Sequence, residues 1–99
     1  MENKVFLNCY CLSGETDYNC IVDYYSFSPC HHGGWINTMD NLIIRLKKWC
    51  LCKWKEKQIC VLIREDRDEK DIQFTMCVYD HLLKCGVDVL LWNGEGEGD

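Results

Sequence analysis

The sequence has one proline, no low-complexity segment within the folded part and no apolar run approaching the roughly 18 residues of a membrane span. Its first residues, MENK, are not followed by the apolar core and small-residue cleavage site of a secretory signal peptide. No glycine-rich loop precedes a helix pattern, as a phosphate-binding loop would. These absences predict no membrane partner and an intracellular chain.

A positive charge balance is also lacking. Eleven Lys and Arg against sixteen Asp and Glu give a net charge of −5 at pH 7. A nucleic-acid-binding domain usually carries a basic face, so we expect no nucleic-acid partner. The charges are nevertheless segregated into a basic segment at 45–57 and an acidic one at 65–71. Runs of this kind are typical of solvated surface.

What the chain does have is apolar material for one core. Hydrophobic residues make up 47% of the 99 residues, which is enough for a single modest domain and too much for a disordered chain. Cysteine is abundant at nine residues, an odd count, and lies inside apolar periodic segments. Reduced cysteine packs as a small hydrophobe there, so we expect a reducing compartment, the cytoplasm or nucleus.

Residue periodicity divides the chain into six elements. Alternating patterns predict strands over 4–13 and 18–28, paired as a hairpin through the turn signal GETD. Apolar residues at helical spacing predict a helix over 35–50, linked to the hairpin by a loop at 29–35 that holds Pro29 and two glycines. An apolar run predicts a strand over 58–65, covered on both faces. A second helix from residue 72 to a glycine cap at Gly86, and a last strand over 87–92, complete the order.

The order β-β-α-β-α-β predicts a single α/β domain over residues 1–93. The last two strands are joined through a helix and are expected to be parallel, whereas the first two are antiparallel. The fold is therefore one mixed sheet packed with two helices, described as three layers, with the helices on one face or split between both. The tail at 94–99 is acidic and glycine-rich and is expected to be disordered.

Metal and catalytic chemistry has one candidate site, Cys30, His31 and His32. A structural zinc site needs four such ligands in tetrahedral array, and the other thiol pairs have C-x-C spacing, which on a strand separates side chains by about 7 Å. Most thiols are therefore expected to fill the core, with no cofactor bound; zinc at Cys30, His31 and His32 is the alternative. Nucleophilic catalysis would need a histidine base held by a third group, so we expect no enzyme.

The stretch Tyr25-Ser26-Phe27-Ser28-Pro29-Cys30 resembles the signature of the AID/APOBEC polynucleotide cytidine deaminases, in which a strand runs into S-W-S-P-C-x-x-C and then a helix. This resemblance implies a truncated cytidine-deaminase-like fold. The second zinc cysteine would fall at Gly33, and the H-x-E helix, with its zinc ligand and general acid/base glutamate, has no counterpart. The resemblance thus implies the fold without the activity, and a degenerate or minimal zinc-dependent deaminase is the enzymatic alternative.

Residues 4–92 also resemble the C-terminal region of the adenovirus early-region-4 thirty-four-kilodalton protein. The pieces that carry the resemblance are KVFLNCYCLSG, VDYYSFS, CHHGG, MDNLIIRLKKWCLC, QICVLIRE and VYDHLLKCGVDVLLW. That family is an adaptor that recruits a host cullin–elongin ubiquitin ligase, so the resemblance implies a viral early protein of the infected cell's cytoplasm or nucleus. The nearest fit to an elongin-binding box is Leu46-Lys47-Lys48-Trp49-Cys50, with Arg45 before it and Trp54 at its aliphatic position.

We therefore predict a small, non-enzymatic protein-binding module for a host or viral protein. The expected surface combines the loop at 29–35 with the aromatic and basic residues of 45–57, since tryptophan, tyrosine and arginine dominate binding hot spots. The candidate anchors are Tyr25, Trp35, Trp49, Lys53 and Trp54, of which Trp54 is expected to be exposed in its lysine-rich connection. A homo-oligomer formed by adding the strand at 4–13 to an exposed sheet edge is the second alternative.

Overall fold

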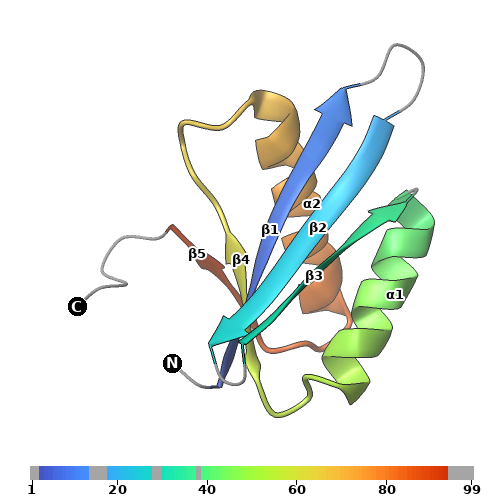
Figure 1. The fold of residues 1–99 in the computed structure, drawn as a ribbon, viewed down its shortest axis with the longest axis vertical. Coiled ribbons are helices and arrows are strands. Elements are labelled where there is room, and N and C mark those ends of the chain that lie inside the picture. Colours follow the sequence, from blue (N-terminus) through green and yellow to red (C-terminus); the bar gives the residue numbers. More distant parts are fainter. Residues whose placement is uncertain (1–2, 14–17, 28–29, 38, 94–99) are drawn as a thin grey trace.

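A computed structural model of the chain describes residues 3–13, 18–27, 30–37 and 39–93. The strands are β1 (Lys4–Ser13), β2 (Tyr18–Phe27), β3 (Cys30–Asn37), β4 (Gln58–Leu62) and β5 (Val89–Trp92), and the helices are α1 (Met39–Cys52) and α2 (Glu69–Lys84) (Figure 1). Neither described helix is long and apolar enough to cross a membrane. The predicted disorder of the tail concerns residues outside the described part.

The strands form one mixed sheet in the order β3-β2-β1-β4-β5. β1 pairs antiparallel with β2, and β4 pairs parallel with both β1 and β5, which confirms the predicted hairpin, the parallel final strands and the α/β class. Because β1 has a strand on each side, it is not available for addition to another sheet. The predicted route to a homo-oligomer through residues 4–13 is therefore wrong.

The link predicted as a loop at 29–35 is instead the strand β3, and α1 begins at Met39 rather than at residue 35. β3 pairs antiparallel with β2, with Gly33 opposite Tyr24 and Gly34 opposite Asp23. A Cβ atom at Gly33 would collide with the Tyr24 phenol, and one at Gly34 would lie 2.6 Å from Asp23 Oδ1. The two glycines therefore leave room for the side chains of Tyr24 and Asp23 to lie over β3, and they do not form a flexible loop.

Both helices pack on one face of the sheet, so the domain has two layers rather than three (Figure 1). On this face β1 contributes Val5, Leu7 and Cys9 to a core that also contains Leu46 of α1 and Val78 of α2. The side chains of these five residues are almost fully buried. Alternate residues of the strands supply the sheet side of the core, as period-2 patterning requires.

The sheet's other face is covered by aromatic rings of the strands themselves. Phe6 stacks on Tyr25 with ring centroids 5.2 Å apart and meets Trp92 edge-on at 5.7 Å. Lys4 Nζ lies 4.2 Å from the centroid of the Trp92 ring. Cys60 of β4 is fully buried on this face, which agrees with the prediction that its strand is covered on both sides.

α2 is attached to β1 by hydrogen bonds as well as by apolar contact. β4 pairs only with the first half of β1, which leaves backbone groups of β1 without a strand partner beyond Asn8 on that side. The Cys11 N–H donates to Asp71 Oδ1 at 2.9 Å. The Thr75 hydroxyl, which donates to the Asp71 carbonyl oxygen at 2.7 Å, also lies 3.3 Å from the Cys9 carbonyl oxygen. α2 thus satisfies strand groups that would otherwise be unpaired. The helix ends before Gly86, whose φ of 81° confirms the predicted glycine cap.

Candidate functional site

Four aromatic residues from four parts of the chain form one cluster, which we call the aromatic cluster. They are Tyr24 of β2, Trp35 of β3, Trp49 of α1 and Trp54, which follows α1. All six pairs of rings have centroids between 4.9 and 6.1 Å apart, and most meet edge-on or tilted. These are the favourable geometries for aromatic pairs, so the cluster joins α1 to the β3 end of the sheet.

Local backbone geometry explains why Trp54 joins this cluster. The N–H groups of Lys53 and Trp54 both donate to the Trp49 carbonyl oxygen at 2.9 Å, which turns the chain back at the end of α1. The turn places the Trp54 indole 5.2 Å from that of Trp49. Only 6% of Trp54 is exposed, so the prediction that it is an exposed anchor is wrong. The lysine-rich composition around it reflects its neighbours' exposure and not its own.

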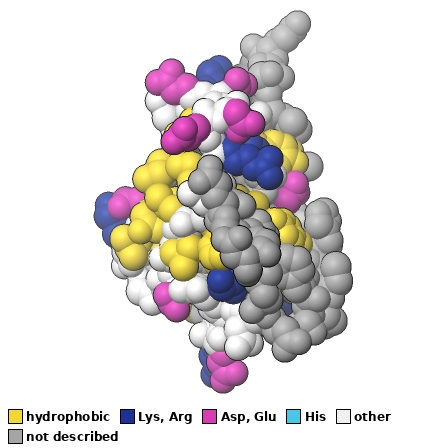
Figure 2. All heavy atoms as spheres, turned by 90° about the vertical axis from the view of Figure 1, so that its left-hand side faces the viewer, with side chains coloured by type: hydrophobic (Ala, Val, Ile, Leu, Met, Phe, Trp, Pro, Cys, Tyr) yellow, Lys and Arg dark blue, Asp and Glu magenta, His cyan; other side chains and the backbone are white. Residues whose placement is uncertain are grey.

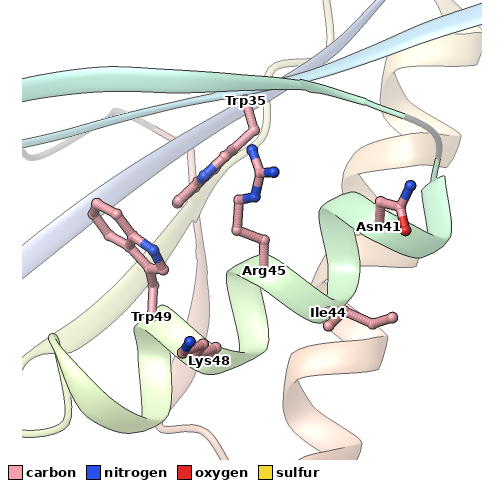
Figure 3. A pocket seen from close by; sticks show the side chains of 6 residues that line it. All are labelled: Trp35, Asn41, Ile44, Arg45, Lys48 and Trp49. Atoms are coloured by element: carbon pink, nitrogen blue, oxygen red, sulfur yellow. The ribbon is translucent and has the colours of Figure 1, made fainter.

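An open cleft of about 640 Å³ lies beside the aromatic cluster, between β3 and α1. Its lining residues are Trp35, Asn41, Ile44, Arg45, Lys48 and Trp49 (Figure 3). Trp35 points from β3 toward α1, and the Arg45 side chain extends back toward it (Figure 3). The volume lies within the range that small ligands and peptide side chains occupy in binding sites.

The chemistry of the cleft combines cations with apolar surface. Arg45 and Lys48 are exposed, and Ile44 is the most exposed large hydrophobic residue of the described chain at 66%. On the other side of the cluster, Lys53 Nζ lies 4.0 Å from the centroid of the Trp49 ring, a cation–π contact. None of the described lining residues is acidic, so the cleft suits a ligand with both negative charge and apolar groups.

The structure brings together three of the five predicted anchors and separates one. Trp35, Trp49 and Trp54 share the aromatic cluster, and Lys53 lies at its edge. Tyr25 points to the opposite face of the sheet, where it stacks on Phe6, and so takes no part in the cleft. Its neighbour Tyr24 is the tyrosine of the cluster, since successive residues of a strand face opposite sides.

The candidate metal ligands occupy the first three positions of β3. Cys30, His31 and His32 pair along the backbone with Phe27, Ser26 and Tyr25, and their side chains lie outside the described part of the structure. Among the side chains that are described, no group of His, Cys, Asp and Glu residues is arranged to hold a metal ion. In the deaminase signature the cysteine leads into a helix, whereas Cys30 begins a strand here. Zinc at this position stays the alternative to the prediction that no cofactor is bound.

The buried thiols behave as core groups. Burial raises the pKa of the Cys11 thiol to about 11 and that of Cys50 to about 12, and it raises the pKa of Cys9 further. Removal from water disfavours the thiolate, so these three residues stay protonated at neutral pH. The eight cysteines whose side chains are described form no disulfide with one another. These findings agree with the expectation that most thiols fill the core.

Of the four α1 residues that line the cleft, sequence reasoning missed Asn41 and Ile44, whereas Arg45 and Lys48 belong to the basic residues of 45–57 that it placed in the binding surface. The four recur at i, i+3, i+4 and i+7, which places them along one side of a helix. The buried residues of α1, at i, i+1, i+4 and i+8, form the neighbouring stripe: Leu42, Ile43, Leu46 and Cys50. The sequence alone therefore indicates a second stripe beside the buried one on α1. Only the position of β3 shows that this stripe is one wall of a cleft.

A scan against models of known protein families and a search of the curated proteins both find no match to the chain. The functional argument therefore rests on the fold and the cleft. The residues that fit an elongin-binding box are not accessible to a partner in this fold, because Leu46, Cys50 and Trp54 are each at most 6% exposed. Contact with a ligase through these residues would require α1 to leave the sheet.

Proposed function

We propose that the chain is a non-enzymatic protein-binding module that receives an acidic, partly apolar segment of a partner protein in the cleft between β3 and α1. One observation carries the proposal: exposed Arg45, Lys48 and Ile44 surround two tryptophan rings that are themselves held by the core. Rigid aromatic groups with arginine beside them are typical of binding hot spots. Because the aromatic cluster fixes both rings, the cleft is formed before a partner arrives, which reduces the entropy lost on binding.

The charge distribution supports an acidic partner. Six of the eleven Lys and Arg residues lie within 45–57, although the whole chain has a net charge of −5. A local positive field on an acidic protein attracts negatively charged segments and disfavours partner surfaces that lack negative charge. We infer that charge provides selectivity, that Ile44 and the half-buried Trp49 provide apolar contact, and that the buried Trp35 holds Trp49 in place.

The cleft lining offers little for catalysis. The lining residues that the structure describes include no Cys, His, Ser, Asp or Glu, the residues that usually supply nucleophiles and general bases. An adaptor needs only to hold a partner, and the resemblance to the adenovirus early proteins supports that role in an infected cell. A host protein is then a candidate partner, and a cullin–elongin ligase subunit is one only through a surface other than the buried residues Leu46, Cys50 and Trp54. Capture of purified elongin and cullin tests this.

A display library of random twelve-residue peptides tests the proposal directly. We expect selected peptides to be rich in Asp, Glu and apolar residues, and the Arg45→Glu/Lys48→Glu double variant to lose their binding by at least tenfold. The matched control is Lys47→Glu/Lys55→Glu, which makes the same change of charge at exposed positions outside the cleft. Equal binding by both variants, with melting temperatures unchanged, would refute the cleft as the site.

The enzymatic alternative, a zinc deaminase-like protein, is tested separately. About one equivalent of zinc in the purified protein, lost in Cys30→Ser, would support it. We expect no stoichiometric zinc, because a structural zinc site needs four ligands in tetrahedral array and this stretch offers three.

A further inference from the structure

β3 is the last strand at one end of the sheet, and among the described strands only β2 pairs with it. It is eight residues long, with the sequence CHHGGWIN. Edge strands are commonly protected by lysine, proline or short length, because their free N–H and C=O groups can pair with another chain. β3 has neither lysine nor proline and is longer than an average strand.

α1 extends past this edge. Its buried residues contact the sheet, and a neighbouring stripe of Asn41, Arg45 and Trp49, at i, i+4 and i+8, lies on the side toward β3 (Figure 3). Ile44 and Lys48 form the outer rim of the same cleft. The helix therefore supports a position beside β3 that the described strands leave vacant. A strand in that position would lie about 4.8 Å from β3.

We propose, on the basis of the function proposed above, that the partner's acidic segment binds as an extra β-strand on the outer edge of β3. Its backbone pairs with that of β3. Alternate side chains face α1, where an acidic group meets Arg45 or Lys48 and an apolar group packs on Trp49. Strand addition of this kind takes affinity from main-chain hydrogen bonds and specificity from the side chains that face the supporting layer.

The charges favour a partner over a second copy of this chain. Pairing of β3 with β3 of another copy would bring two sets of Arg45 and Lys48 toward the same interface, where like charges repel. An extended segment also fits the spacing, because its alternate residues are about 6.6–6.8 Å apart and reach successive turns of α1. A helix laid in the cleft would leave the edge groups of β3 unpaired.

The test uses a ten-residue peptide of alternating Glu and Val and two N-methylated forms of it. One form is methylated on alternate residues and the other on the intervening ones, so that only one of them blocks the N–H groups that face β3. We expect one form to lose at least tenfold in affinity and the other to bind within about threefold of the parent peptide. Hydrogen exchange should slow at β3 amides and not at β5.

Each outcome separates the two proposals. Equal binding of parent and both methylated forms, with unchanged exchange at β3, would refute strand addition and leave the cleft as the proposed site. Equal loss in both forms is decided by the exchange of β3 amides with the parent peptide: slowing supports strand addition and its absence refutes it. No binding by the parent or by any display-selected peptide would refute the proposed function itself.

Discussion

The two ends of the sheet have the same architecture and opposite chemistry. At each end a helix on the same face lies beside an edge strand, α1 beside β3 and α2 beside β5. The β3 end has an eight-residue strand and a cleft with two cations, whereas β5 has four residues. On the β5 side, hydrophobic side chains gather over α2 and β5 (Figure 2), and Met76, Leu83 and Leu91 are 36–49% exposed. Charge can select an acidic partner at the first end, whereas the second end presents a strip of exposed apolar side chains.

The helices also differ in how the sheet holds them. α1 is joined to it through the rings of Tyr24, Trp35, Trp49 and Trp54, and α2 through hydrogen bonds to β1. Ring contacts are broad and tolerate small shifts, whereas hydrogen bonds fix one register. The cleft is therefore built where the helix rests on rings, which provide its apolar floor.

The largest expected effect is the loss of an aromatic residue at the β3 end. Replacing Trp54 by alanine should lower the free energy of unfolding by about 3–5 kcal/mol, because a buried ring is removed and a cavity remains. Chemical denaturation measures the loss. Lys55→Ala is the matched control, since its side chain is exposed one residue further on, and should change stability by less than about 0.5 kcal/mol. Similar values for the two variants would restore the prediction that Trp54 is exposed.

The next effect concerns α2. Asp71→Ala removes the acceptor of the Cys11 N–H and should cost about 1–3 kcal/mol, because a partly buried backbone donor loses its partner. Asp80→Ala is the control on the same helix: its salt bridge with Lys84 is largely solvent-exposed and contributes under about 1 kcal/mol. If both changes cost the same, α2 is not held by hydrogen bonds and the contrast between the helices fails.

These expectations show which parts of the molecule the sequence predicts. Local patterns were sufficient for the hairpin, β4, α2 and β5: the hairpin strands alternate, α2 has apolar residues at helical spacing, and β4 is an apolar run buried on both faces. The helix that joins β4 to β5 makes these two strands parallel. Local patterns failed at β3, where Trp35 and Ile36 also fit the spacing of the following helix. The two glycines looked like a break, and only the Tyr24 and Asp23 side chains across the ladder explain them. Whether such a segment forms a strand depends on pairing with residues that are distant in the sequence, and local periodicity carries no information about that pairing.

The site was predictable in composition and not in detail. The tryptophans and the basic segment at 45–57 were readable as a binding surface. The burial of Trp54 depends on the turn after α1. Tyr24, and not the predicted Tyr25, belongs to the aromatic cluster because of which face of β2 meets the helices. Both follow from tertiary contacts. These contacts fix the orientation of a side chain, which its neighbours in the sequence do not determine.

A smaller effect depends on pH. Burial, its largest cause, raises the pKa of Cys11 from 9.0 to about 11, so the folded chain binds a proton that the unfolded chain releases above pH 9. The contribution is fully present below pH 9 and is lost as pH rises toward 11, so the free energy of unfolding should fall across that window. Cys11→Ser should make this decline shallower, as measured by denaturation at several pH values. An unchanged slope would mean that other groups, such as the thiols near α1, cause the decline.

The smallest expected effect comes from changing the β5 end. Leu83 and Leu91 are 49% and 36% exposed, so replacing both with glutamate should alter the free energy of unfolding by less than about 1 kcal/mol. It should shorten retention on a hydrophobic column, because the exposed apolar strip on that side becomes charged. Peptide affinity at the β3 end should stay within about twofold, since the two ends lie on opposite sides of three central strands.

The matched change at the β3 end, Ile44→Glu, adds one negative charge to the rim of the cleft and should weaken the binding of an acidic peptide severalfold. If the β5 variant weakens the peptide as much as Ile44→Glu does, the acidic segment is recognised by overall charge, and the chemical difference between the two ends does not determine where it binds.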